Sequence, residues 1–122
     1  MMRGVRGATC ARANSREAVF EATRDLLARL IAANRIEAEH IASVFITATP
    51  DLNADYPAYV AREMGLSRVP LLCATEIDVP GAMKRVIRIL IHCETEMKQD
   101  EVRHLYLRET ARLRPDLAGG EE

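Results

Sequence analysis

Residues Ser15–Asn34, SREAVFEATRDLLARLIAAN, contain the clearest periodic pattern in the chain. Apolar side chains recur three or four residues apart, which is the spacing of one face of a helix. They are Val19, Ala22, Leu26, Leu27, Leu30 and Ile31. Asn14 followed by Glu17 resembles a capping box, so we expect the helix to begin at about Ser15. The pattern predicts one long helix that ends near Asn34.

Segments rich in β-branched and aromatic residues predict five strands around this helix. Gly4 and Gly7 leave room for close backbone approach in the first strand, and Pro50 bounds the second. The expected strands span Met2–Cys10, Ser43–Thr49, Val69–Thr75, Val86–Thr95 and His104–Leu107. Between the second and third strands, Pro57 suits the first turn of a short helix that Gly65 stops.

The segment Val86–Thr95 (VIRILIHCET) fits either a strand or a buried helix. Ile87, Ile89 and Ile91 alternate along it, and this alternation favours a strand. Arg88 then lies on the opposite face of the sheet.

These elements predict an α+β domain with a single mixed sheet of about five strands, one long helix and one short helix. We expect the domain to span residues 1–117, followed by a polar tail at 118–122; the polar character begins at Arg112. One long helix cannot cover both faces of a five-stranded sheet. We therefore expect the uncovered face to contact another subunit.

The composition excludes several classes of partner. The 122 residues suit one domain, and 48% hydrophobic with 29% charged residues is ordinary for a globular protein. With a net charge of −1 and 4% aromatic residues, the chain has no basic field or stacking surface, so we expect no nucleic acid partner. The longest apolar run, Val86–Ile91, is too short to cross a bilayer, so we expect no membrane partner.

The cysteines and the first residues bear on the compartment. Cys10, Cys73 and Cys93 are odd in number and widely spaced, so they form neither a disulfide framework nor a zinc pattern. Residues Met1–Gly4 lack the apolar segment of a signal peptide. We therefore expect a cytoplasmic protein.

The sequence lacks the motifs of covalent, metal and phosphate-loop chemistry. It has no nucleophile elbow, glycine-rich phosphate loop or metal-binding helix motif. His40, His92 and His104 are far apart and show no ligand spacing. We expect no cofactor, so an enzyme built on this chain must rely on electrostatic and orientational catalysis. Plain binding is the alternative.

Seven fragments, in order and covering Arg3–Leu117, make the chain similar to the AroH-type chorismate mutases. They are RGVRGAT (Arg3–Thr9), ATPDL (Ala48–Leu52), VPLLC (Val69–Cys73), EIDV (Glu76–Val79), IR (Ile87–Arg88), RHLYL (Arg103–Leu107) and LRPDL (Leu113–Leu117). The resemblance implies a homotrimer of the pseudo-α/β-barrel type, with sheets at its centre and active sites at subunit interfaces. The implied reaction is the Claisen rearrangement of chorismate to prephenate, on the route to phenylalanine and tyrosine.

The resemblance also implies roles for single residues. Arg88 would stabilise the negative charge that develops on the ether oxygen, and Glu76 would bind the substrate hydroxyl and orient arginine. Arg6 would bind a substrate carboxylate, and Tyr106 would donate a hydrogen bond to a carboxylate. Cys73 would contact the hydroxyl region. Each has a structural alternative. Arg88 could form a surface ion pair, Arg6 could be a solvated edge-strand charge, and Glu76 could be a loop carboxylate at a strand end. Tyr106 could be a core or interface tyrosine, and Cys73 a small buried residue.

Further residues would surround the substrate. They are Arg62 and Arg114 as cations at the mouth, Tyr56 as an aromatic wall, and Ala58, Leu71, Leu72 and Leu113 as pocket lining. Members of the family often have a basic residue where this chain has Tyr59, so one cation near the entrance is lost here. Strict alternation would separate Cys73 from Glu76, so we expect the strand to end or bulge near Thr75.

Two rival functions remain open. The same arginines could serve a binding module that senses an aromatic-pathway acid without converting it. A trimeric enamine or imine deaminase of the Rid type also uses an interfacial arginine on a carboxylate, but the rest of such a motif is missing. The tail from Leu113 onward is either a lid that orders over substrate or a frayed terminus.

Overall fold

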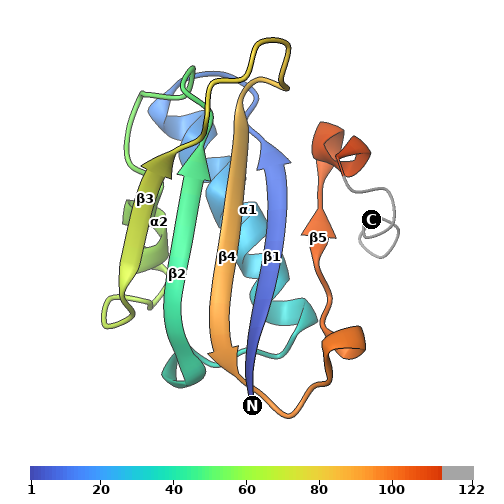
Figure 1. Cartoon of the computed structure of the whole chain (residues 1–122). Helices are drawn as coiled ribbons and strands as arrows, with labels where there is room; N and C mark the ends of the chain where they lie inside the picture. The colour runs from blue at the N-terminus through green and yellow to red at the C-terminus, as the bar shows by residue number, and fades with distance from the viewer. Residues whose placement is uncertain (114–122) are drawn as a thin grey trace.

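A single mixed sheet organises the structure, a computed structural model that describes residues 1–113 (Figure 1). Its spatial order is β3-β2-β4-β1-β5. The inner pairs β1–β4 and β2–β4 are antiparallel, and the outer pairs β2–β3 and β1–β5 are parallel. The strands are β1 (Met2–Cys10), β2 (Ile41–Ala48), β3 (Leu71–Thr75), β4 (Val86–Glu94) and β5 (Leu105–Tyr106). This confirms the expected mixed five-stranded sheet.

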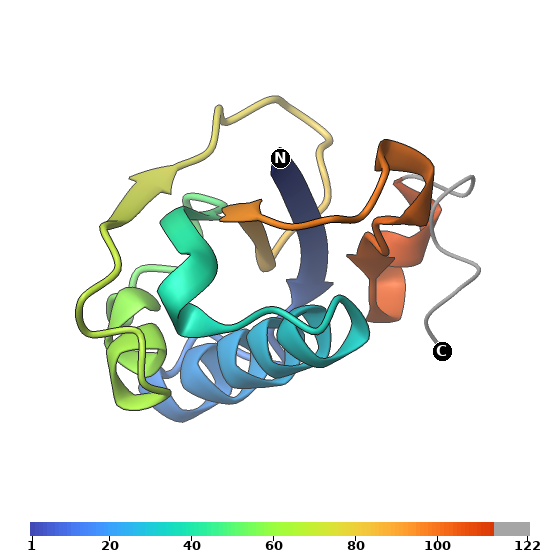
Figure 2. The same ribbon diagram turned by 90° about the horizontal axis from the view of Figure 1, so that it is seen from below.

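Both α-helices lie against the same face of the sheet (Figure 2). They are α1 (Arg16–Ala33) and α2 (Ala58–Glu63). Leu26 and Leu30 of α1 are fully buried against strand residues such as Val5 and Ile89, because the apolar stripe of the helix meets the apolar face of the sheet. The other face has no helix over it and leaves Phe45 41% exposed. The expectation of one covered and one uncovered face is confirmed.

The start of α1 corrects one prediction. Ser15, not Asn14, is the N-cap residue: its backbone is extended, and its Oγ accepts a hydrogen bond from the Ala18 N–H at 3.1 Å. Asn14 instead bonds the loop before α2, where its Oδ1 accepts from the N–H groups of Asn53 and Ala54, each at 3.1 Å. The amide side chain thus ties a loop in place, and the hydroxyl one residue later caps the helix.

The far end of α1 is fixed by a buried side chain. Asn34 caps the helix, is 4% exposed, and donates from Nδ2 to the carbonyl oxygens of Leu30 (2.9 Å) and Arg103 (3.0 Å). Its Oδ1 accepts from the Arg103 N–H at 2.7 Å. All polar groups of this amide are used, so Asn34 joins the helix to the segment that leads into β5.

The last part of the described chain departs from the predicted strand and tail. β5 is only two residues long, and His104 does not pair as a strand residue, because its Nδ1 accepts the Arg6 N–H at 3.1 Å. Arg112, expected in the polar tail, belongs to the 3-10 helix η3 (Arg108–Arg112). Buried Thr110 holds η3 to the sheet by donating to the Ala8 carbonyl at 2.9 Å. The expected domain boundary at residue 117 lies outside the described residues.

Two further 3-10 helices, η1 (Ala38–His40) and η2 (Gln99–Glu101), were not predicted. The short helix was predicted. It is α2, which begins directly after Pro57, and Gly65 follows its last turn with φ +99°, a conformation suited to glycine. Among residues 1–113, no helix combines the length and the apolar character needed to cross a membrane.

Candidate functional site

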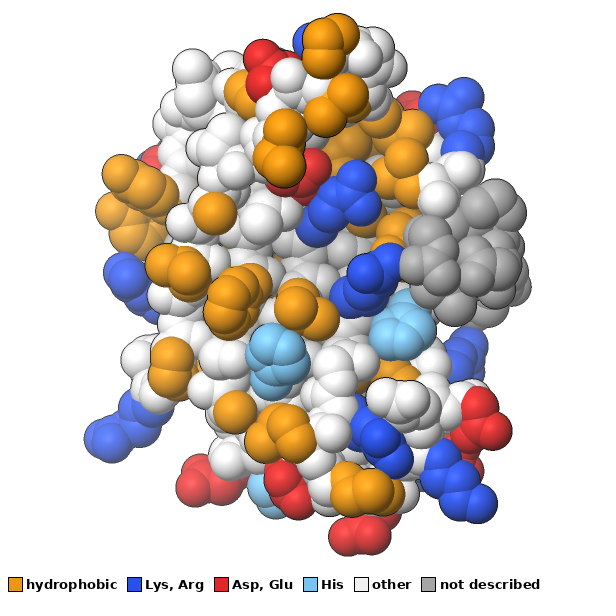
Figure 3. All heavy atoms as spheres, viewed as in Figure 1, with side chains coloured by type: hydrophobic (Ala, Val, Ile, Leu, Met, Phe, Trp, Pro, Cys, Tyr) orange, Lys and Arg blue, Asp and Glu red, His pale blue; other side chains and the backbone are white. Residues whose placement is uncertain are grey.

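The uncovered face of the sheet contains a cavity of about 260 Å³ between β1, β2, β4 and β5. Arg6, Thr47 and Arg88 reach it because residues two apart share a face, and because Arg88 pairs with both Thr47 and Ala8. Figure 3 shows this face, where basic side chains lie near the middle and apolar side chains surround them. Its lining residues are Arg6, Gly7, Phe45, Thr47, Arg88, Ile89, Leu90 and Tyr106.

Arg88 is held by an ion pair beside this cavity. Its Nε donates to Glu76 Oε2 at 3.1 Å, with the Arg88 side chain 43% exposed and the Glu76 side chain 16% exposed. Thr47 Oγ1 donates to the same carboxylate oxygen at 2.7 Å. One oxygen of Glu76 therefore receives two hydrogen bonds, which fix both the carboxylate and the guanidinium.

Glu76 lies one residue past the end of β3 and on the same face of the sheet as Arg88. The strand stops at Thr75, and the Glu76 N–H donates to the Ala48 carbonyl at 2.9 Å. The expected strand end near Thr75 is confirmed. Leu72 pairs with Phe45 on the uncovered face, and Glu76, four residues later, keeps that alternation and lies on the same face. The separation of Glu76 from Cys73 that strict alternation predicts is therefore observed.

Arg6 lies beside Tyr106. The Arg6 Cζ atom is 6.0 Å from the centre of the Tyr106 ring, at the outer limit of a cation–π contact. Tyr106 is 2% exposed and pairs with Ala8, so its ring lies on the same face of the sheet as Arg6. The Arg6 backbone is itself fixed by the bond from its N–H to His104 Nδ1. We call Arg6, Glu76, Arg88 and Tyr106 the Arg88 group.

The other expected site residues lie elsewhere in the chain. Cys73 pairs with buried Ile46, so its side chain points to the helix layer, away from the face of Arg88. Burial raises the pKa of the Cys73 thiol, and the Ala58 N–H and the Arg62 charge oppose that rise. We call Tyr56, Ala58, Arg62 and Cys73 the Cys73 group.

Aromatic contacts hold part of the Cys73 group together. The Tyr56 and Tyr59 rings meet edge to face with centres 5.8 Å apart, and the Arg62 Cζ lies 5.6 Å from the centre of the Tyr59 ring. Tyr59 thus contacts the neighbouring cation as well as the neighbouring ring.

The remaining lining residues do not share one surface. Leu71 packs against the core on the helix face, whereas Leu72 is 57% exposed on the uncovered face. Leu113 is partly buried at the end of η3. Arg114 lies outside the described residues.

Sequence reasoning missed Thr47, Phe45 and Leu90. Alternation in SVFITAT places Phe45 and Thr47 on one face, and this signal was available. The pairing of Thr47 with Arg88 could not be predicted in this way, because the register between β2 and β4 joins segments about forty residues apart.

The chemistry of the Arg88 group suits the binding of a dianion. Two guanidinium groups supply forked N–H donors for carboxylates, and Glu76 and Tyr106 add an acceptor and a hydroxyl. In the part of the chain that the structure describes, no three His, Cys, Asp or Glu side chains lie close enough to hold a metal. The group can fix charges and orient a bound molecule, and it contains no strong nucleophile.

Comparison with known proteins agrees with this chemistry. The family model for chorismate mutase type I matches residues 2–117. The chain is 50% identical to chorismate mutase AroH of Thermus thermophilus over 118 residues, which is 96% of this chain and 97% of that one. It is 40% identical to chorismate mutase AroH of Bacillus subtilis (strain 168) over 119 residues, 97% of this chain and 94% of that one.

A solved structure supports the fold. A chorismate mutase from Clostridium thermocellum superimposes with a TM-score of 0.88 and 34% sequence identity, covering 90% of this chain and 98% of that chain. The two-layer arrangement described above is therefore also found in that enzyme.

Proposed function

The chain belongs to the chorismate mutase type I family, and from that premise we propose how this isomerase converts chorismate to prephenate in aromatic amino acid biosynthesis. Chorismate carries two carboxylates and rearranges in one pericyclic step. No covalent intermediate is needed, so the enzyme has only to hold a reactive conformer and to stabilise the charge that develops.

Arg88 stabilises the transition state. As the ether C–O bond breaks, negative charge grows on the oxygen, and a cation already in place there lowers the barrier. Glu76 accepts a hydrogen bond from the Arg88 Nε–H at 3.1 Å, so the terminal N–H groups of the guanidinium are left to face the ether oxygen. The second oxygen of Glu76 is available to the substrate hydroxyl.

Arg6 and Tyr106 bind a substrate carboxylate. Arg6 offers a planar fork, and the hydroxyl of Tyr106, a residue that is 2% exposed, adds a neutral donor. The support for this role is their position: both line the same cavity as Arg88. Together the residues fix one end of the dianion while Arg88 acts at the other.

We propose that the site is completed by a second subunit of a homotrimer. Cys73 and Arg88 point to opposite sides of one sheet, so one chain does not enclose a substrate with both groups. The exposed side chains Phe45 and Leu72 lie on the uncovered face and supply apolar area for a partner. A neighbour's Cys73 group would then close over the Arg88 group, with Arg114 and Leu113 at the mouth.

The protein's compartment is inferred from its thiols. Cys10, Cys73 and Cys93 are all free, which suits a reducing environment. A cytoplasmic location is therefore part of this proposal.

The observation that carries the mechanism is the Arg88–Glu76 pair beside the cavity. We expect Arg88→Ala to lower kcat by about 10²–10³, the usual cost of one electrostatic donor. Arg88→Lys keeps the charge but loses the fork, so it should retain little activity. Arg24→Ala is the matched control, because Arg24 also pairs with a glutamate (Glu63, 3.3 Å) but lies on the outer surface.

The assay follows loss of chorismate and formation of prephenate by purified protein. Near-normal turnover by Arg88→Ala would refute the assigned role. Binding of chorismate without any turnover by the unmodified protein would favour the sensing module instead.

A further inference from the structure

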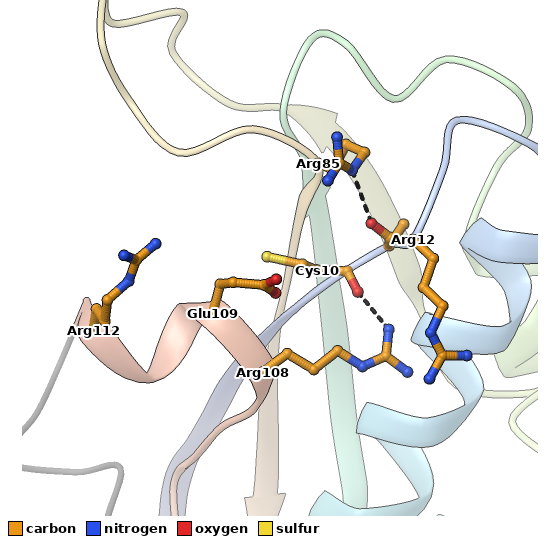
Figure 4. A pocket seen from close by; sticks show the side chains of 7 residues that line it. Cys10, Arg12, Arg85, Arg108, Glu109 and Arg112 are labelled. Atoms are coloured by element: carbon orange, nitrogen blue, oxygen red, sulfur yellow. Dashed lines mark hydrogen bonds between the residues drawn. The ribbon is translucent and has the colours of Figure 1, made fainter.

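A second and larger cavity, of about 760 Å³, lies at the carboxyl end of β1 (Figure 4). Four arginines from three separate segments line it: Arg12 follows β1, Arg85 precedes β4, and Arg108 and Arg112 belong to η3. The carboxylate among the lining residues is that of Glu109. We call this cavity the arginine pocket.

Two of these arginines are held in unusual backbone conformations. Arg85 has φ +56° and Arg108 has φ +57°, a region that residues with a side chain rarely adopt. Hydrogen bonds hold both in place. The Arg85 N–H donates to Asp51 Oδ2 at 3.0 Å, and its Nε donates to the Ala11 carbonyl at 3.0 Å. The fold thus fixes these two arginines instead of leaving them to move in solvent.

Arg108 is already neutralised. Its guanidinium donates to the Cys10 carbonyl and to Glu21 Oε2 at 2.9 Å, and Asp25 lies 3.8 Å away. Its role is to hold η3 against β1 and α1, which places Glu109 and Arg112 at the pocket.

The remaining charges do not balance. The Glu109 carboxylate accepts hydrogen bonds from its own backbone N–H and from the Cys10 thiol. These hydrogen bonds, together with the charges of Arg85 and Arg108, lower the pKa of Glu109, so it is ionised at neutral pH. It is the one negative charge among the lining residues, beside Arg12, Arg85 and Arg112, while Asp51 accepts the Arg85 backbone N–H from outside the lining. Arg12 pairs with Glu21 at 3.7 Å, but its side chain is 73% exposed and Glu21 is shared with Arg108, which lies closer at 2.9 Å. No ion pair joins Arg112 to any other residue of 1–113. Within the described residues the pocket is therefore positively charged.

We propose that the arginine pocket is a second anion-binding site, for a small dianion that carries carboxylate or phosphate groups. Guanidinium forks suit both groups, and fixed cations bind an anion without first having to be ordered. The pocket shares no lining residue with the cavity beside Arg88, although Cys10 pairs with Val86 only two residues along β1 from the pairing of Ala8 with Arg88. The proposal does not depend on the reaction catalysed.

The test is an NMR titration of the intact protein at low ionic strength, with inorganic phosphate in one series and succinate in another. We expect saturable shifts of the backbone amides of Cys10, Ala11, Arg85 and Arg112. The tighter of the two ligands identifies the source as a phosphate ester or a dicarboxylate. Added NaCl should weaken both, because the pocket is open to solvent.

Variants then separate the pocket from net charge and from the catalytic site. The double variant Arg85→Gln with Arg112→Gln should weaken binding at least tenfold, since one charged hydrogen bond contributes roughly a factor of ten. The double variant Arg24→Gln with Arg68→Gln loses the same charge elsewhere and should bind like the unmodified protein. Arg88→Gln should also leave the affinity unchanged.

If the pocket variant does not fold, Arg12→Gln alone serves, because the Arg12 side chain is largely exposed. Its affinity should fall several-fold. The proposal is wrong if neither anion gives saturable shifts at the pocket amides, as a neighbouring subunit covering the pocket would cause. It is also wrong if both double variants weaken binding equally.

Discussion

Thr47 and Arg88 share one acceptor, the Oε2 atom of Glu76, at 2.7 Å and 3.1 Å. The hydroxyl thus fixes the carboxylate that in turn fixes the guanidinium. Because the Glu76 side chain is 16% exposed, water cannot easily replace a lost hydrogen bond there. The position of the Arg88 guanidinium therefore depends on Thr47, a neutral residue of β2.

We expect Thr47→Val to lower kcat/KM roughly tenfold or more, because a hydrogen bond to a charged group is lost while the shape is kept. Most of the loss should fall on kcat, since we propose that Arg88 acts on the transition state. Thr47→Ser, which restores the hydroxyl, should recover most of the activity. Equal activities of the valine and serine variants in the chorismate assay would show that the hydroxyl has no positioning role.

The thiols differ in reactivity. Burial, followed by the neighbouring Glu109 carboxylate, raises the pKa of Cys10 from 9.0 to about 11. At pH 8, below both values, its thiolate fraction is then about 100-fold lower than that of an ordinary thiol. Iodoacetamide should therefore modify partly exposed Cys73 before buried Cys10 and Cys93, as followed by peptide mass spectrometry. Modification of Cys10 first would contradict this order.

At the scale of elements, the sequence predicted what local pattern determines. The periodicity of α1 and the alternation of Ile87, Ile89 and Ile91 were confirmed because each element has one buried face. The cap at Asn14 was wrong, because Asn14 is used by a distant loop. Strand β5 is shorter than predicted, because the His104 side chain takes a place that a backbone carbonyl would fill.

The candidate site was also predicted only in part from the sequence. The sequence motifs supplied Arg6, Glu76, Arg88 and Tyr106, and the structure brings these four to one cavity and its rim. Alternation in the sequence already separates Cys73 from Glu76. The motifs did not supply the pairings between strands, so they did not reveal that Thr47 lies beside Arg88. Long-range register is set by packing of the whole sheet and is absent from any local pattern.

The junction of β1, β5 and α1 depends on Gly7. A Cβ atom at this position would lie 2.5 Å from the Leu105 carbonyl oxygen and 3.0 Å from Leu26 Cδ1. Since a backbone atom is the closest neighbour, β5 would have to shift, and Tyr106 with it. We expect Gly7→Ala to lower the free energy of unfolding by about 1–3 kcal/mol and to raise KM, measured by urea denaturation and by the chorismate assay.

Gly4→Ala is the control for that experiment. At Gly4 the nearest atoms to an added Cβ are side-chain carbons of Leu90 and His92 at 3.7 Å and 3.8 Å, an ordinary contact distance. The free energy of unfolding should change little. If both alanine variants are equally stable, close approach at Gly7 does not constrain β5.

At the scale of the whole molecule, the two faces of the sheet have different roles. The helix layer supplies the core, and the uncovered face holds the Arg88 group between exposed apolar side chains. The Cys73 group lies on the helix side and at the β3 edge. A site that uses both groups requires two chains, and this requirement can be tested without a structure of the assembly.

We expect inactive variants to complement each other. Arg88→Ala and Arg62→Ala damage different groups, so a trimer that mixes them has one undamaged site where an intact Arg88 meets a neighbour's intact Arg62. About three quarters of randomly assembled trimers contain both variants, and each of these retains one good site of three. Co-refolding should therefore restore about a quarter of the unmodified activity. Activity no higher than the average of the two parent variants would mean that each site lies within one chain.

The central position of β4 also determines when the chain can fold during synthesis. β1 and β2 both pair mainly with β4, whose residues 86–94 are made after about three quarters of the protein. On the ribosome, the nascent chain therefore presents two strands with unpaired edges while α1 is already complete. Until Glu94 leaves the exit tunnel there is no sheet centre, so chaperones that bind extended apolar segments have their longest opportunity in that interval.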